Sequence, residues 1–338
     1  MVRFGLIGCG KHAQWAVMPA MKLAPSCTLV AVADPVQANL DSIEDPAVHR
    51  HREHREMLAR TDLDAIYVAT PADVHCAVTL DALRSGRHVL CEKPLGMDVA
   101  ECRQMVDTAR RHNRFLAVDF ETRFIGAYRQ ARQWIIDGHI GTIRAVHINS
   151  FWDGHKTQGP LAERRHRFLD KTGCLDCGIH RIDLVRFFCG GGTWQDVQAL
   201  GAWFGEKCTF PPHIAILARL TPGILVTVNA SFAHTAYIKA RHLHEAFVII
   251  GEKGVIVLEG NPGNLVFRLV GDSRCDTAPL QEEGHDQVIP CVLEAFAAAL
   301  VPGATPDPTL ATGDDGLMAQ IAVDAANQEA IRRGDASR

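Results

Sequence analysis

The sequence predicts an α/β protein in which a doubly wound parallel sheet comes first and a second α+β domain, built on a large, mainly antiparallel sheet, follows. Two observations support this prediction. Short apolar runs of strand length alternate with helical patterns in the first part of the chain, as βαβ units require. From residue 143 onward, long β-type runs follow one another, and turn signals join several of them as in hairpins. We therefore expect domains at residues 1–122 and 123–338.

Composition and charge indicate an ordinary globular chain whose partner is a small molecule. The 338 residues are enough for two domains, and 47% of them are apolar. A formal net charge of −4 without a basic stripe argues against nucleic acid, and no apolar run is long enough to span a bilayer. The start of the chain lacks the charged and apolar regions of a signal peptide, so we expect a cytoplasmic protein.

The cysteines and histidines predict neither a disulfide framework nor a metal site. The eleven cysteines are an odd number, and several lie singly in apolar runs, where a reduced thiol packs as a small hydrophobe. Cys174 and Cys177 have the CxxC spacing of redox and zinc sites, but no second such pair accompanies them, so we interpret the spacing as fortuitous. The mixed-charge run at 49–56 is typical of a solvated face.

The first strand, turn and helix have the fingerprint of a dinucleotide-binding Rossmann fold. A strand pattern runs into a G-x-G-x-x-A turn at residues 8–13. Gly8 permits the tight turn, Gly10 lets backbone N–H groups approach a pyrophosphate, and Ala13 allows the helix to pack closely on the strand. The second strand ends at Asp34, about twenty residues further on, where an acid would bind the ribose hydroxyls. Together these features predict NAD as the cofactor.

The next two strands end in polar residues at the edge where open α/β sheets bind ligands. The strand at 65–69 ends in Thr70 and Pro71, and the helical pattern after it contains His75 and stops at Gly86. The following strand delivers Lys93. A long-stemmed cation at this position can reach a bound substrate, whereas the alternative is a solvated loop lysine.

These motifs resemble the glucose–fructose oxidoreductase/inositol dehydrogenase family (Gfo/Idh/MocA). The resemblance is carried by the glycine turn, Asp34-Pro35, Thr70-Pro71 with His75, and Glu92-Lys93-Pro94. It implies that Lys93 is catalytic and that its peptide bond to Pro94 is cis, as this bond commonly is in the family. The sequence departs from the family at Ala72-Asp73, where asparagine is more common after the Thr-Pro pair. The cofactor contacts that the resemblance implies are Gly8, Gly10, Ala13, Asp34, Thr70, Pro71, His75 and Glu92.

The second half of the chain contains a second candidate signature within a predicted sheet domain. Asp176 and His180 are four residues apart in a helical pattern and share one face. A lone histidine on such a helix is more often structural, but the resemblance implies that D-x-G-x-H is the second catalytic signature of the family. The β-type runs around it are 143–152, 197–204, 214–220, 224–232, 247–251, 255–258 and 265–270.

Three further residues are candidates for substrate binding. Arg123 follows the last strand of the first half, where the resemblance expects an arginine near the domain junction; a structural salt bridge is the alternative. His155 and Arg167 lie in the polar stretch 153–170, which suits a loop that selects the substrate, or simply a solvated basic loop. This stretch departs from the commoner family sequences, so the particular substrate cannot be inferred.

We interpret the chain as an NAD-dependent dehydrogenase acting on a secondary alcohol of a sugar, sugar derivative or cyclitol. His180 would accept the hydroxyl proton, Lys93 would polarise the same oxygen, and Asp176 would orient the pair. The alternatives are an NAD-dependent glycosidase and a nucleotide-sensing protein without turnover. We also expect a homo-oligomer formed through the second-domain sheet, and a closing helix near residues 314–331.

Overall fold

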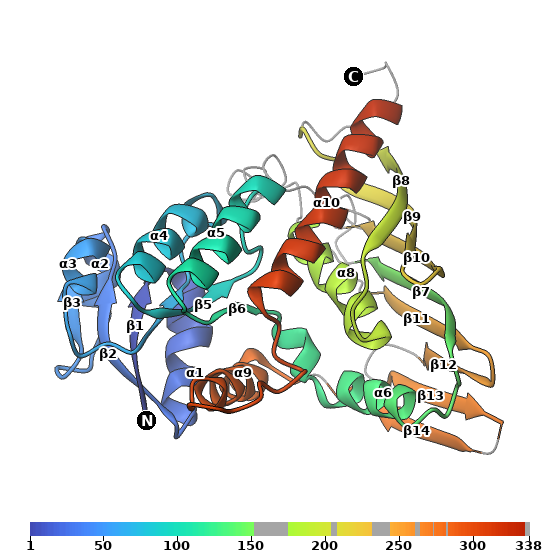
Figure 1. Cartoon of the computed structure of the whole chain (residues 1–338), viewed down its shortest axis with the longest axis horizontal. Coiled ribbons are helices and arrows are strands. Elements are labelled where there is room, and N and C mark those ends of the chain that lie inside the picture. The colour runs from blue at the N-terminus through green and yellow to red at the C-terminus, as the bar shows by residue number, and fades with distance from the viewer. Residues whose placement is uncertain are drawn as a thin grey trace. The chain divides into compact units, whose positions relative to one another are not determined.

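The computed structural model describes residues 1–151, 175–203, 208–231, 244–260, 264–272, 274–281 and 283–334. Contacts within the chain divide it into two compact units (Figure 1). The first unit consists of Met1–Ile125 and Glu283–Gln320, and the second of Gly126–Glu282 and Ile321–Arg338. The expected domain ranges do not include this return of the chain to the first unit, because nothing in the apolar pattern of a helix says which sheet it covers.

The described residues of the first unit form a six-stranded sheet of order β3-β2-β1-β4-β5-β6, and every neighbouring pair in it is parallel. This confirms the predicted doubly wound parallel sheet. The order reverses between β1 and β4, which is where such sheets bind ligands beyond their carboxyl ends. The strands are β1 (Val2–Ile7), β2 (Cys27–Ala33), β3 (His49–His51), β4 (Ala65–Val68), β5 (His88–Glu92) and β6 (Leu116–Asp119).

Helices cover both faces of this sheet, as buried parallel strands require. Leu90 packs into one apolar cluster with Phe4 and Phe296, whose rings lie 5.8 Å apart. The next residue, Cys91, points to the other face and contacts Thr79. Helices α1 and α9 lie side by side, as do α4 and α5 (Figure 1). The helices are η1 (Ala13–Val17, a π-helix), α1 (Met18–Leu23), α2 (Gln37–Asp41), α3 (His54–Leu58), α4 (Ala72–Arg84), α5 (Val99–Arg111), η2 (Glu121–Phe124, a 3₁₀ helix) and α9 (His285–Ala299).

The described residues of the second unit form an eight-stranded sheet of order β14-β13-β12-β11-β7-β10-β9-β8. Among the pairs that the structure describes, β7 and β10 are parallel and all the others are antiparallel. The prediction of a large, mainly antiparallel sheet is therefore confirmed. The strands are β7 (Ile143–Phe151), β8 (Trp194–Ala202), β9 (His213–Leu220), β10 (Ile224–Ser231), β11 (His244–Gly251), β12 (Gly254–Glu259), β13 (Val266–Gly271) and β14 (Cys275–Pro279).

Two helices, α6 (Gly126–Ile136) and α8 (Leu175–Cys189), pack on one face of this sheet. Tyr128 of α6 and Phe188 of α8 meet Phe247 and Phe267 of the sheet, with ring centroids 5.4 to 6.5 Å apart. Such aromatic pairs stabilise a core beyond their buried area alone. The long helix α10 (Gly313–Arg333) begins in the first unit and ends in the second.

Other features of the described residues bear on the expectations from the sequence. The nine cysteines whose side chains are described are free thiols, and no helix in the described ranges is long and apolar enough to cross a membrane. No group of three or more potential ligand side chains in these ranges is placed to hold a metal ion. Cys174 lies outside the described residues, and the side chain of Cys177 is not described.

Candidate active site

The turn after β1 leaves an open surface for a ligand. Gly8 has φ +92°, and a Cβ atom on it would lie 2.6 Å from the carbonyl oxygen of Ala69, so only glycine fits there. At Gly10, by contrast, no described atom lies within 4 Å of the place that a Cβ would occupy. Ala13 is buried at the start of η1. The turn therefore closes against the loop after β4 on one side and is open beside Gly10.

Asp34 joins the end of β2 to this turn. Its Oδ2 accepts hydrogen bonds from the backbone N–H of Cys9 at 2.7 Å and from the amide of Asn39 at 3.0 Å, while its Oδ1 accepts from Val36 N–H at 2.8 Å. An ionised carboxylate offers about four acceptor sites, so one remains for a ribose hydroxyl. The buried side chain therefore both orders the loop and keeps acceptor capacity.

A cation that sequence reasoning missed lies near the end of β2. Arg52 follows β3 and is exposed, and its guanidinium donates to the carbonyl oxygen of Pro35 at 2.7 Å. Because β3 pairs in parallel with β2, residues just beyond both strands meet at the same edge. The parallel pairing brings Arg52 beside Pro35 although 17 positions separate them.

His75 connects the loops after β4 and β5. The imidazole is buried, with Nδ1 2.7 Å from the carbonyl oxygen of Pro94 and Nε2 2.9 Å from that of Thr70. Burial lowers the pKa of His75, so the neutral ring donates to only one of these oxygens at a time. The hydroxyl oxygen of Thr70 is buried without a hydrogen-bond partner among the described residues. Pro71, directly before α4, is exposed.

Lys93 follows β5 directly and is half-buried. Its peptide bond to Pro94 is cis, as the family resemblance implies. Its backbone N–H donates to Oε2 of Glu92 at 3.2 Å. The end of β5 therefore places a cation and a carboxylate together at the carboxyl edge of the sheet.

Glu92 is buried and remains ionised because hydrogen-bond donors and positive charges surround it. Its Oε1 lies 2.8 Å from His12 Nε2 and accepts a hydrogen bond from Tyr67 at 2.9 Å. Burial opposes ionisation, but the hydrogen bond and charge of His12, with the charge of Lys93, outweigh it and lower the pKa of Glu92. Burial likewise opposes the charge on His12, yet the hydrogen bond to Glu92 raises the His12 pKa.

Two more carboxyl groups lie around this carboxylate, and sequence reasoning missed both. Asp119, at the end of β6, contacts the hydroxyl of Tyr67. Burial, with the charges of Glu92 and Glu121, raises the pKa of Asp119 well above its usual range. Burial and Glu92 also raise the pKa of Glu121 to about 7. A signal for Asp119 was available in the sequence. Two successive apolar runs end in an acidic residue, Glu92 and Asp119, and the ends of parallel strands meet at one edge of the sheet.

The second signature lies in the second unit, so it is described separately from Lys93. His180 is buried in α8, and Asp183 one turn later is fully buried. Arg181 pairs with Glu245 of β11. Asp176 lies in the first turn of α8, but its side chain is outside the described part of the chain.

The structure describes only one of the three candidate substrate-binding residues. Arg123 is buried in η2, with its guanidinium 3.5 Å from a carboxylate oxygen of Asp315. This is the contact that the salt-bridge alternative requires, and substrate binding by Arg123 stays a prediction. His155 and Arg167 lie outside the described residues.

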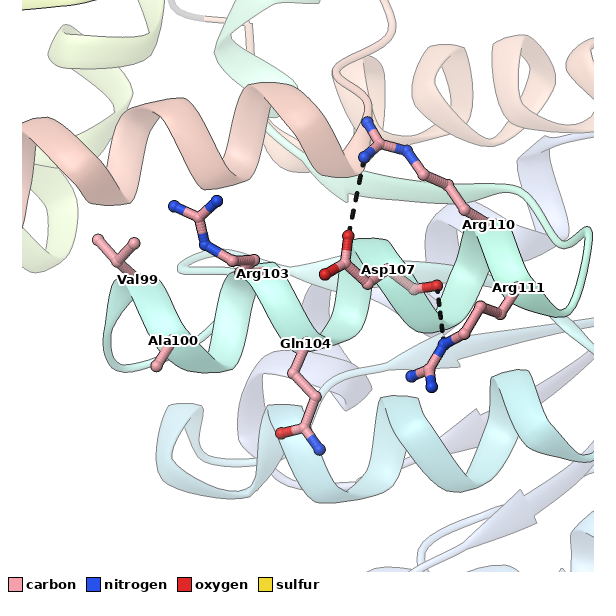
Figure 2. Close-up of a pocket in the computed structure, with 7 residues that line it drawn as sticks. All are labelled: Val99, Ala100, Arg103, Gln104, Asp107, Arg110 and Arg111. Atoms are coloured by element: carbon pink, nitrogen blue, oxygen red, sulfur yellow. Dashed lines mark hydrogen bonds and ion pairs between the residues drawn. The ribbon is translucent and has the colours of Figure 1, made fainter.

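A cavity of about 890 Å³ lies on the outer face of α5, away from the sequence-predicted site residues (Figure 2). Asp107 pairs with Arg110, and its backbone carbonyl accepts from Arg111 (Figure 2); the distances are 3.8 Å and 3.3 Å. Three arginines and one aspartate line this surface, so it carries a net positive charge. The cavity is lined by Val99, Ala100, Arg103, Gln104, Asp107, Arg110 and Arg111.

Two family models match the chain. The model described as the oxidoreductase family with an NAD-binding Rossmann fold (GFO/IDH/MocA) matches residues 2–120. The model of the GFO/IDH/MocA C-terminal domain matches residues 128–257. The two matches correspond to the two sheets, since the first contains β1 to β6 and the second contains β7 to β11 and part of β12.

Individual proteins match over nearly the whole chain. Inositol 2-dehydrogenase of Rhizobium meliloti (strain 1021) is 26% identical over 338 residues, 96% of each chain. A 1,5-anhydro-D-fructose reductase of Ensifer adhaerens is 29% identical over 334 residues, which cover 94% of this chain and 92% of the reductase. For two other relatives the matched part is 59% and 57% of their own length.

A solved structure has the same fold. An oxidoreductase from Agrobacterium radiobacter, crystallised with NAD+, L-tartaric acid and magnesium, matches with a TM-score of 0.83 over 99% of this chain and 97% of that one. The two sequences are 18% identical, so this likeness shows the fold alone.

The position of Asp34 predicts that NAD binds more tightly than NADP. A 2′-phosphate near this carboxylate would meet a repulsion on the order of 4 kcal/mol before screening, at about 4 Å and an effective dielectric of about 20. After screening and the counteracting charge of Arg52, we expect NADP to bind about a hundredfold more weakly. Dissociation constants for both reduced nucleotides, measured by fluorescence titration, check this.

Two variants distinguish the effects of the Asp34 and Arg52 charges on NADP binding. Asp34→Asn should reduce the discrimination, whereas Arg52→Ala should increase it because the favourable cation is lost. Comparable affinities in the wild-type protein, or a preference for NADP, would contradict the role given to Asp34.

Proposed function

We propose that this chain, which belongs to the GFO/IDH/MocA family of NAD-binding oxidoreductases, transfers a hydride between NAD and a secondary alcohol of a sugar, sugar derivative or cyclitol. The observation that carries the proposal is Lys93 at the carboxyl end of β5, with its backbone fixed by an ionised glutamate. The relatives support the substrate class, since one is an inositol dehydrogenase and another an anhydrofructose reductase. A cytoplasmic location stays a prediction from the sequence.

The residues of the first unit fit NAD. The open side of Gly10 leaves room for a pyrophosphate against backbone N–H groups, and Asp34 keeps acceptor capacity for a ribose hydroxyl. The buried hydroxyl oxygen of Thr70 lacks a described partner, as expected of a group that waits for a ligand. When bound, the cofactor supplies the redox chemistry by accepting the hydride.

In this proposal Lys93, His180 and Asp176 each have a separate role at the reacting hydroxyl group. Lys93 donates a hydrogen bond to the reacting hydroxyl oxygen and stabilises the negative charge that develops on it. His180 accepts the hydroxyl proton, for which an imidazole has a suitable pKa near neutrality. Asp176 holds a neighbouring hydroxyl and orients the imidazole. Glu92 accepts from the backbone N–H of Lys93 and also interacts electrostatically with its positive side chain.

The first test of this function is the variant Lys93→Met. We expect turnover to fall by about a hundredfold or more, since electrostatic and acid–base groups contribute on that order. The affinity for NADH should remain close to that of the wild type, because the lysine meets the substrate. A panel of polyols, aldoses and sugar acids, followed by NADH absorbance, identifies the substrate and measures the loss.

Lys22→Met, at an exposed lysine of the same unit, is the matched control and should leave turnover unchanged. In the same assay His180→Ala should abolish the rise of oxidation rate with pH, because a base must be unprotonated to accept the proton. Near-normal turnover of Lys93→Met would remove this residue from the mechanism. Release of free sugar without net NADH would instead identify the glycosidase alternative.

We further propose that the chain forms a homo-oligomer through the open face of the second-unit sheet. Strands β8 to β13 alternate buried residues, which face α6 and α8, with residues that point to the other side. Large apolar side chains on that other side are exposed, and contiguous exposed apolar surface marks an interaction site. They are Leu200, Leu217, Leu225, Ile250 and Val270.

A charge on this face should break the assembly. Leu217→Lys, at a side chain that is 46% exposed, is expected to shift the mass toward one chain, because burying the ammonium in an apolar interface is costly. Size-exclusion chromatography with light scattering measures this mass. Val301→Lys introduces the same charge at an exposed apolar residue of the first unit and should have no effect. A monomeric wild-type protein would contradict the assembly.

A further inference from the structure

We propose that Asp119 and Tyr67 are positioning residues: Asp119 is a neutral carboxylic acid that donates to the hydroxyl oxygen of Tyr67, and Tyr67 donates its own proton to Glu92. The carboxylate fixed in this way holds Lys93 at the end of β5. The inference rests on the proposed function, because it assigns to this buried series of hydrogen bonds the role of holding Lys93 in place. Nothing in the motifs of the sequence indicates it.

The register of three adjacent strands builds this chain of hydrogen bonds. Glu92 of β5 and Asp119 of β6 are register partners, so two carboxyl groups stand side by side at the end of the sheet. Tyr67, one strand further in β4, is fully buried, and its hydroxyl contacts both of them. Two like charges in such a place would repel each other strongly in a medium of low dielectric. The phenol separates the carboxyl groups and links them.

The single proton of the Tyr67 hydroxyl favours a neutral state for one of the two carboxyl groups. This hydroxyl contacts carboxyl oxygens of both Glu92 and Asp119, so the second contact becomes a full hydrogen bond only when the carboxyl side supplies a proton. The phenol itself is not ionised, because burial, with Asp119 and Glu92 nearby, raises the pKa of Tyr67 well above its ordinary value. The hydrogen-bonded series of Glu92, Tyr67 and Asp119 therefore contains one carboxylic acid and one carboxylate.

The surroundings decide that Asp119 is the acid. Glu92 accepts from His12 Nε2 and from the backbone N–H of Lys93, and both positive side chains stabilise its charge. Oδ1 of Asp119 is buried without a hydrogen-bond partner among the described residues, which would be costly for an ionised group. Its other neighbours are negative or neutral: Glu92, Glu121 and the phenol. The direction of the Asp119 pKa agrees with this geometry.

Several groups of variable charge face Glu92 from other elements, which is why a fixed partner matters. His12 lies before η1, and its ring is 5.7 Å from that of His285 of α9. Glu121 of η2 and His75 of α4 also interact electrostatically with Glu92. Since these groups gain or lose protons at different pH, the phenol of Tyr67, held by the neutral acid, gives Glu92 a side-chain donor whose charge does not change near neutrality.

Variants of both residues test the positioning role. Tyr67→Phe and Asp119→Leu should each lower turnover of myo-inositol, or of the best compound in the panel, by about tenfold or more, the equivalent of one hydrogen bond to a charged group. Asp119→Asn keeps a neutral side chain that can donate to the phenol, so it should remain within about threefold of the wild type. The affinity for NADH should be unchanged in all three.

Two readouts are independent of turnover. Infrared difference spectra between wild type and Asp119→Asn at neutral pH should show the C=O band of a protonated carboxyl group in the wild type only, and 13C-labelled aspartate should shift that band. Thermal unfolding gives the sign of the linkage. The unfolded side chain releases its proton above its ordinary pKa of about 3.9 and the folded one keeps it, so the wild-type Tm should fall relative to Asp119→Asn as pH rises from there to neutrality.

The outcomes separate the claims. Absence of the infrared band, or a loss of turnover in Asp119→Asn as large as in Asp119→Leu, overturns the neutral acid. Wild-type turnover in Tyr67→Phe overturns the positioning role. Tyr128→Phe removes a buried phenol bonded to Glu245 in the second unit, and it should leave the aspartate band in place. If no compound of the panel is oxidised, the proposed function fails while the band and the Tm comparison still decide the state of Asp119.

Discussion

An ionised carboxylate buried at the end of β5 is the constraint on which the first unit depends. An isolated charge at such depth would cost several kcal/mol and would be neutralised instead. Glu92 stays charged because His12, Tyr67 and the backbone of Lys93 all donate to it. These donors come from the glycine turn, from β4 and from the end of β5. One charge therefore joins the loops that form the carboxyl edge of the sheet.

The negative charge of Glu92 determines the protonation states of the acidic groups around it. Asp119 lies opposite on β6 and cannot ionise at the same pH, and the pKa of Glu121 is raised to about 7 for a related reason. Environments that push the pKa values of adjacent acids apart are typical of catalytic sites. The geometry around Lys93 and the family of the chain thus point to the same part of the molecule.

The sequence predicts what depends on local pattern and misses what depends on register. Gly8 and Gly86, both with positive φ, and the position of Lys93 follow from strand, turn and helix signals. The edge strand β3 is short and polar, and the edge strand β14 is short and mixes polar with small apolar residues, so no apolar run marks either of them. Tyr67 and Asp119 are 52 positions apart and meet only because β4, β5 and β6 are adjacent. Which unit α9 joins is likewise set by packing, not by its own pattern.

A neutron structure of the protein with NADH, after exchange into deuterium oxide, tests the central claim most directly because it locates the protons of the buried chain. The account predicts deuterium on the carboxyl group of Asp119 facing Tyr67, on the phenol facing Glu92, and on Nε2 of His12, with none on Glu92. Deuterium on Glu92 and a bare carboxylate at Asp119 would contradict it.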